Sequence, residues 1–118
     1  MNEYALYLDD VRHPPRTGEN WVLCRTVGDM RAILEVQGIP KLASFDYELG
    51  RTDPGHNGHD ALSCFLDYLI SDAHEEDPLV VEVRLHTSSG YGAKRMAQLL
   101  KERQSACRSA GFILKSIY

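Results

Sequence analysis

Residues 41–50 read KLASFDYELG, and this stretch decides which fold the rest of the sequence is compared with. A mostly apolar run, Leu42–Phe45, has the length of a buried strand and is followed at once by Asp46. Gly50 then predicts a turn away from the sheet. The carboxyl ends of strands in an open parallel α/β sheet form the ligand crevice, so an acid at this place is a candidate functional residue.

Two other apolar runs also end in polar residues. Tyr4–Leu8 leads into Asp9, and Val80–Leu85 leads into His86. Since the carboxyl ends of parallel strands meet at one edge of a sheet, we expect these two ends to converge with the one at Asp46.

The composition is that of a globular protein, with one domain expected over residues 1–118: 43% of the residues are apolar and 25% are charged. A net charge of −4 argues against general binding of duplex DNA, which depends on neutralising phosphates with Lys and Arg. Strand-length apolar runs, and an N-terminus without a basic and then apolar segment, predict no membrane span and a cytoplasmic location. Cys24, Cys64 and Cys107 contain no Cys-x-x-Cys pair, so we expect them to be buried free cysteines.

The order of periodic segments predicts an α/β protein. The segment Val11–Asn20 contains Pro14 and Pro15 and cannot be a regular helix. Strands are expected at residues 4–8, 21–26, 42–45, 80–85 and 112–117. Helices are expected after a cap at Thr26 and ending at Gly38, after a cap at Asn57 or Asp60, and from Gly90 to Gly111, with a charged break at residues 74–78.

This order predicts an open, parallel, five-stranded sheet with right-handed crossovers. It resembles a response-regulator receiver domain of flavodoxin-like strand order, with the first helix replaced by the proline loop and the last helix missing. The resemblance implies that one face of the sheet is uncovered, because those two helices cover the same face in receivers. Glu82 and Arg84 alternate with Val81 and Val83, which suits an uncovered or dimerised face.

Three acids fall at the predicted strand ends: Asp9, Asp10 and Asp46. Taken singly, each acid would be a turn residue or a loop cap. Carboxylates close together repel one another by about 1–4 kcal/mol per pair in a partly solvated site, unless a cation or a proton joins them. Mg²⁺ prefers oxygen ligands and is the expected cofactor. Arg12 or Lys94 folded over the site is the alternative source of positive charge.

His86 is the expected general acid or base, since an imidazole beside carboxylates titrates near neutral pH. The residues that follow it supply groups that bind phosphate oxygens. These are the hydroxyls of Thr87 and Ser88, the backbone amide of Gly92 near a helix N-terminus, and the charge of Lys94. We expect this corner to bind a phosphate-sized anion.

Other motifs are weaker. His56 and His59 have a spacing that suits zinc, but a loop pair without a clear third ligand favours surface histidines. Gly90-Tyr91-Gly92 is too short to be a dinucleotide fingerprint, and the sequence contains no P-loop and no Gly-x-Ser-x-Gly elbow.

Five motifs run through nearly the whole chain: LDDVRHPP (8–15), SFDYELG (44–50), NGHDAL (57–62), LHTSS (85–89) and GAKRM (92–96). Together they resemble the cyclic-phosphate-processing receiver-like domain family. The resemblance implies action on the cyclic phosphates of nucleotides or of RNA ends. Mapped onto this sequence, it singles out Asp9, Asp10, Arg12, Asp46, Asn57, Gly58, Asp60, His86 and Gly92.

Three positions depart from the family pattern. Tyr47 stands where the family has His, Glu48 replaces an Asp, and Thr87 replaces a Ser. Glu48 keeps a carboxylate at longer reach, whereas Tyr47 removes a candidate catalytic or ligand group.

We therefore expect a phosphoesterase-like enzyme with Asp46, His86 and Asp10 as candidate catalytic residues. Asp46 would be a nucleophile or metal ligand, Asp9 and Asp10 would hold Mg²⁺, and His86 would move the proton. Contacts with phosphate or substrate are expected from Arg12, Thr87, Ser88, Gly92, Lys94 and Asn57.

Two alternatives remain open. One is a non-catalytic receiver-like module that binds a nucleotide or a protein and dimerises through the uncovered sheet face. The other is a phosphoacceptor receiver with Asp46 as the acceptor. For the enzyme, the expected partner is a phosphate-containing small molecule or an RNA end.

Overall fold

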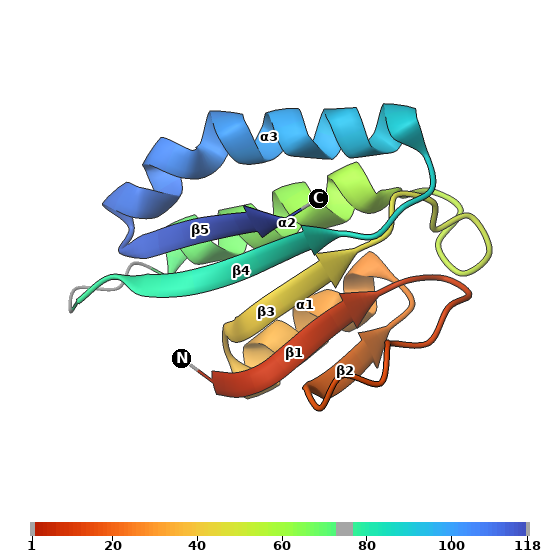
Figure 1. Ribbon diagram of the computed structural model, residues 1–118, viewed down its shortest axis with the longest axis horizontal. Helices are drawn as coiled ribbons and strands as arrows, with labels where there is room; N and C mark the ends of the chain where they lie inside the picture. Colours follow the sequence, from red (N-terminus) through yellow and green to blue (C-terminus); the bar gives the residue numbers. More distant parts are fainter. Residues whose placement is uncertain (1, 73–76, 118) are drawn as a thin grey trace.

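The computed structural model describes residues 2–72 and 77–117, so most of the charged break expected at 74–78, with His74, lies outside the described residues. These residues form one parallel five-stranded sheet of order β2-β1-β3-β4-β5, with three helices (Figure 1). None of the helices within them is both long and apolar enough to cross a membrane. The elements are β1 Asn2–Leu8, β2 Asn20–Cys24, α1 Val27–Gln37, β3 Pro40–Phe45, α2 Gly58–Ser71, β4 Leu79–Leu85, α3 Gly90–Ser109 and β5 Phe112–Ile117. The receiver-like α/β fold predicted from the sequence is confirmed.

Side-chain caps fix where the helices begin. Thr26 caps α1, and its hydroxyl accepts a hydrogen bond from the backbone amide of Asp29 at 3.0 Å. Of the two candidate caps for α2, Asn57 is the one used, and it forms a reciprocal capping box with Asp60. The start of α2 is therefore fixed directly beside the end of β3, where the site lies.

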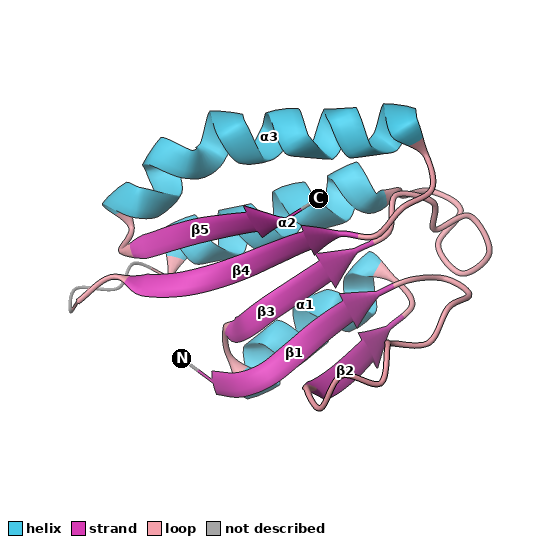
Figure 2. Cartoon of the chain, viewed as in Figure 1, coloured by secondary structure: helices cyan, strands magenta, loops and turns pink. Residues whose placement is uncertain are grey.

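The helices pack against one face of the sheet, as Figure 2 shows. Alternate residues of the strands face them, among them Leu6 of β1, Phe45 of β3 and Val83 of β4, and all three are fully buried. The Phe45 ring meets the ring of Phe65 of α2 edge-on, with centroids 5.5 Å apart. Burying each large apolar side chain of this kind stabilises the fold by about 1.5–3 kcal/mol. The core thus lies between the sheet and the helices.

The opposite face carries no helix among the described residues, because residues 9–19 form a loop where a receiver domain has its first helix. Figure 1 shows this loop returning beside β2. Glu82 of β4 lies on this open face with Arg84, which forms an ion pair with it. Lys115 of β5 lies 3.8 Å from the same carboxylate. The polar alternation of β4 therefore belongs to the face that no helix of the described residues covers, as predicted.

Gly58, the first residue of α2, lies against the backbone that follows β3. Its amide donates to the carbonyl oxygen of Tyr47 at 2.6 Å. A Cβ atom at this position would lie 1.9 Å from the carbonyl oxygen of Asp46 and 2.7 Å from Cα of Tyr47. Since both are backbone atoms, no side-chain rotation removes the clash, and the glycine sets how closely α2 approaches Asp46.

Substituting Gly58→Ala is expected to lower the free energy of unfolding by about 1–3 kcal/mol, as overpacking does at other crowded positions. Urea denaturation measures the change. Gly55→Ala is the matched control, because a Cβ atom at Gly55 would meet nothing within 4 Å. Equal stability of the two variants would show that the close approach at Gly58 is not a constraint.

Candidate functional site

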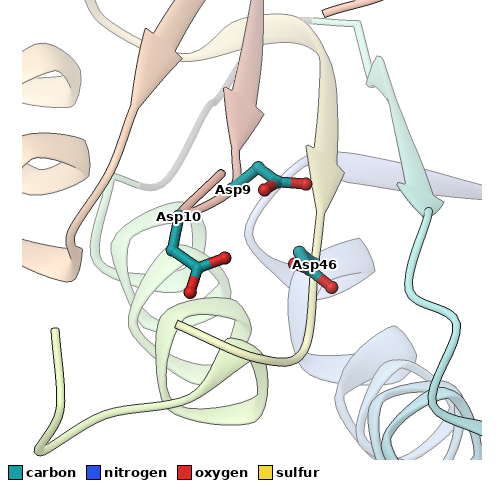
Figure 3. Close-up of side chains that lie close together, drawn as sticks. All are labelled: Asp9, Asp10 and Asp46. Carbon is teal, nitrogen blue, oxygen red and sulfur yellow. The ribbon is translucent and has the colours of Figure 1, made fainter. Parts of the chain in front are cut away.

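Three carboxylates lie together at the carboxyl edge of the sheet, and we call Asp9, Asp10 and Asp46 the rim cluster. Asp9 and Asp10 follow β1 and Asp46 follows β3, and Figure 3 shows the side chains gathered between the ends of these strands. The two strands pair with Leu8 opposite Phe45, and the Asp46 amide donates to the Leu8 carbonyl at 3.0 Å. One oxygen of each carboxylate lies within 4.8 Å of the others. The predicted convergence of these two strand ends is therefore found.

Asp9 is almost fully buried, but its carboxylate has several donors. Oδ1 accepts hydrogen bonds from the backbone amides of Val11 and Arg12 at 2.8 and 2.7 Å. Oδ2 lies 3.0 Å from Nε2 of His86. Burial alone would raise the pKa of Asp9, but the two amides and His86 outweigh it and leave the pKa below its ordinary value. Asp9 is therefore ionised at neutral pH.

Asp46 is shifted in the opposite direction. Burial and then the charge of Asp9 raise the pKa of Asp46 above its ordinary value. Opposing effects come from the amide of Tyr47, which donates to Oδ1 at 2.8 Å, from His86, and from a hydrogen bond with the Thr87 side chain. The rim cluster therefore carries more negative charge than its neighbours offset, which favours the uptake of a cation or a proton.

His86 joins the rim cluster from the end of β4, so the third predicted strand end also converges. Its Nε2 faces the ionised Asp9, which can only accept, so we assign the proton to Nε2. Nδ1 lies 2.7 Å from Oγ of Ser44 and accepts the hydroxyl hydrogen in this tautomer. The ring stacks on Tyr7, with centroids 4.3 Å apart and an angle of 8° between planes. Desolvation lowers the pKa of His86 although Asp9 and Asp46 oppose it, so the imidazole is neutral.

A cavity of about 570 Å³, which we call the rim cavity, opens over the rim cluster. Its wall contains the three acids and three residues expected to contact phosphate: Arg12, Asn57 and Ser88. Nη1 of Arg12 also donates to the backbone oxygen of His86 at 3.0 Å, which ties the loop after β1 to the end of β4. The volume lies in the range of small-molecule pockets, about 300–1,000 Å³.

Three other residues expected to contact phosphate do not line the rim cavity. The Thr87 hydroxyl contacts Asp46 and also accepts from the amide of Ser89. The amide of Gly92 donates to Oγ of Ser89 at 3.0 Å, as part of the cap of α3. Lys94 is exposed on α3 and borders other grooves. A phosphate contact from Thr87, Gly92 or Lys94 stays a prediction.

Two residues that hold His86 were not expected from the sequence. Ser44 of β3 and Tyr7 of β1 are paired across the sheet and have side chains on its open face. The sequence does indicate which face of the sheet they lie on, because each lies one residue away from core positions of its strand. Their relevance becomes visible only when the strand register is known.

Tyr47, which replaces the histidine of the family pattern, also takes part in the site. It lines the rim cavity, and its hydroxyl accepts from Nη1 of Arg95 at 3.0 Å. A Cβ atom at Gly92 would lie 2.2 Å from Cγ of Tyr47, so this glycine makes room for the ring. The amide of Arg51, which also lines the rim cavity, donates to Asp10 at 3.1 Å. Arg51 and Arg95 were not expected from the sequence either.

The rim cluster fits a hard divalent cation such as Mg²⁺. All the candidate ligand atoms are carboxylate oxygens, which this class of ion prefers. An ionised carboxylate has about four acceptor positions, and the hydrogen bonds to Asp9, Asp10 and Asp46 use only part of them. The donor set and its unbalanced charge are therefore compatible with the expected cofactor.

Adding Mg²⁺ to metal-free protein is expected to raise its melting temperature, because the cation offsets the repulsion within the rim cluster. At a Mg²⁺ concentration of about 100 Kd the gain corresponds to roughly 2.7 kcal/mol. Asp46→Asn is expected to lose most of this gain and to be more stable than the parent in EDTA, by about 1 kcal/mol or more. Thermal denaturation measures both. Asp67→Asn, on the exposed side of α2, is the control, and an equal response of Asp46→Asn to Mg²⁺ would contradict the assignment.

His56 forms a pair with Asp53. Nδ1 of His56 lies 2.8 Å from Oδ1 of Asp53, whose Oδ2 accepts from the amide of Val27 at 2.9 Å. The hydrogen bond with Asp53 raises the pKa of His56 above 6.5. The folded chain thus holds this proton more tightly, so the contribution of the pair to stability is present below about pH 6.5 and lost as the pH rises through the folded pKa.

An NMR titration of the His56 ring should therefore give a midpoint above 6.5. In Asp53→Asn the midpoint should fall towards 6.5, because the variant has no carboxylate to stabilise the charged ring. An unchanged midpoint in the variant would show that Asp53 does not control the titration.

A family model for the cyclic-phosphate processing receiver domain matches residues 4–102, which include the rim cluster, His86 and the whole wall of the rim cavity. A search of curated proteins and a search of solved structures each gave no match. The family match covers most of the chain and agrees with the sheet order and the open face described above. The chain therefore belongs to the cyclic-phosphate processing receiver domain family.

Proposed function

We propose that the rim cavity binds a cyclic phosphate ester, of a nucleotide or an RNA end, and hydrolyses it. The observation that supports this most is the gathering of Asp9, Asp10 and Asp46 at one cavity large enough for a small ligand, with His86 in contact with Asp9. Membership of the cyclic-phosphate processing family supports the substrate class.

The residues of the cavity wall have distinct roles in this proposal. The Arg12 guanidinium offsets the charge of the bound phosphate, and Asn57 and Ser88 hold its oxygens. Asp10 and Asp46 face the reacting group together, as candidate cation ligands. When bound, Mg²⁺ would neutralise the cluster and act as a Lewis acid towards the phosphoryl oxygens.

His86 moves the proton. Hydrolysis adds water across one P–O bond, so the water oxygen bonds to phosphorus, the ring P–O bond breaks, and a proton passes to the leaving oxygen. His86 takes up and returns this proton from its place beside the rim cavity, where its ring contacts Asp9 at 3.0 Å. Asp9 holds the proton on Nε2 and stabilises the imidazolium while it exists.

One observation favours a second candidate, a receiver-like module that binds the phosphate without turning it over. Both ring nitrogens of His86 already have partners, Asp9 and Ser44, and a general acid or base that contacts substrate directly needs one of them released. In this candidate the open face of the sheet is the surface for self-association, which sedimentation velocity would detect as a dimer.

The two candidates differ in turnover. With adenosine 2′,3′-cyclic monophosphate and Mg²⁺, the enzyme is expected to form a nucleoside monophosphate, detected by ³¹P NMR. Asp46→Asn and His86→Ala are expected to lower kcat by about 10²–10⁴, the usual size of an acid–base contribution. Asp67→Asn is again the control and should keep the parent kcat.

Unchanged turnover in both Asp46→Asn and His86→Ala would contradict the mechanism. Binding of the cyclic nucleotide without any product in the parent protein would support the module instead. Binding is measured by calorimetry on the same samples, so the two results are obtained independently.

A further inference from the structure

A second cavity, of about 370 Å³, lies on the open face of the sheet, and we call it the open-face cavity. Its apolar wall comes from Tyr7 of β1, Trp21 of β2, Leu85 of β4 and Pro15 of the loop. The rings of Tyr7 and Trp21 meet edge-on, with centroids 5.5 Å apart and planes at 81°. The indole Nε1 donates to Oγ1 of Thr17 at 3.2 Å, which holds the loop against β2. The cavity is therefore an aromatic recess on a face that no helix of the described residues covers.

Polar groups lie beside these rings. Ser44 and Arg84 occupy paired positions of β3 and β4 and both line the cavity, together with the exposed His13. The guanidinium of Arg84 is planar and is oriented by its ion pair with Glu82. A mainly apolar cavity with a few fixed polar groups has the make-up of a small-molecule site. Aromatic rings beside a guanidinium suit a flat, nitrogen-containing ring, which can stack on them and accept hydrogen bonds.

The open-face cavity adjoins the rim cavity. His86 lines the open-face cavity, and its Nε2 contacts Asp9, which lines the rim cavity. The loop after β1 also borders both, through Arg12 in the rim cavity and His13 in the open-face cavity. The rim cavity is acidic and suits a cation with a phosphate, whereas the open-face cavity is aromatic. A ligand that used both would have a phosphate at one end and a planar ring at the other.

We propose that the open-face cavity binds the base of a nucleotide whose phosphate lies in the rim cavity. The proposal rests on the function proposed above and narrows it, since it makes nucleotides better ligands than phosphate esters without a ring. Stacking of a base on an aromatic side chain changes binding affinity by about tenfold or more, which is large enough to measure. The nucleotide crosses the boundary where Arg12 of the rim cavity donates to the backbone oxygen of His86, which lines the open-face cavity.

Trp21 is the only tryptophan of the chain, so its fluorescence reports on this cavity alone. Adenosine, adenosine 2′,3′-cyclic monophosphate and glycerol 1,2-cyclic phosphate are titrated against the full chain in Mg²⁺. Adenosine and the nucleotide are expected to quench Trp21, whereas the glycerol ester binds without quenching. The nucleotide is expected to bind about tenfold or more tightly than the glycerol ester by calorimetry.

Arg84→Gln tests the cavity directly. It is expected to weaken the nucleotide and adenosine by about tenfold and to leave the glycerol ester unchanged. Lys115→Gln is the matched control, because Lys115 also contacts Glu82 on the same face but does not line the cavity. Trp21→Phe, measured by calorimetry, is a second and milder variant in case Arg84→Gln folds poorly. Circular dichroism shows whether each variant is folded.

The inference is overturned if the nucleotide and the glycerol ester bind equally, or if Arg84→Gln and Trp21→Phe leave adenosine binding unchanged. Its failure is separate from failure of the proposed function. Quenching by adenosine that is lost in Arg84→Gln, in a protein with no turnover, would refute the hydrolase and keep the base site. Turnover of the glycerol ester at the rate of the nucleotide would keep the hydrolase and remove the base site.

Discussion

Burying the Asp9 carboxylate requires donors from separate parts of the chain, and meeting that requirement ties the rim of the sheet together. The amides of Val11 and Arg12 turn the chain away from β1, and His86 brings in the end of β4. The backbone of Asp9 is used as well, since its amide donates to Cys24 of β2 at 3.1 Å. Three strand ends therefore meet at one residue.

Much of the fold follows from local chemistry in the sequence. The prolines after β1 exclude a helix, Thr26 and Asn57 cap two helices, and the alternation in β4 indicates an uncovered face. Since strand ends in a parallel sheet share an edge, the rim cluster also follows once the strands are placed. These features depend on neighbours in sequence or on one topological rule, which is why they can be predicted.

The rest depends on contacts between residues far apart in the sequence. Ser44 reaches His86 because β3 and β4 pair in one particular register, which no local pattern fixes. The exposed place of Lys94 on α3 depends on how that helix is rotated, and Arg95, one residue later, is the one that reaches Tyr47. The open-face cavity likewise forms from four strands and a loop, so its aromatic residues look unrelated in the sequence.

The position of β5 in the sheet also bears on how copies of the chain behave at high concentration. β5 pairs only with β4 among the described strands, so its far side is the outer edge of the sheet. An outer strand is a template on which another molecule can add a strand, and proteins commonly use lysine there to discourage aggregation. Lys115 stands in the middle of β5, beside the partly exposed Ile113. Its charge at this edge thus disfavours the pairing of β5 with a second copy of the chain.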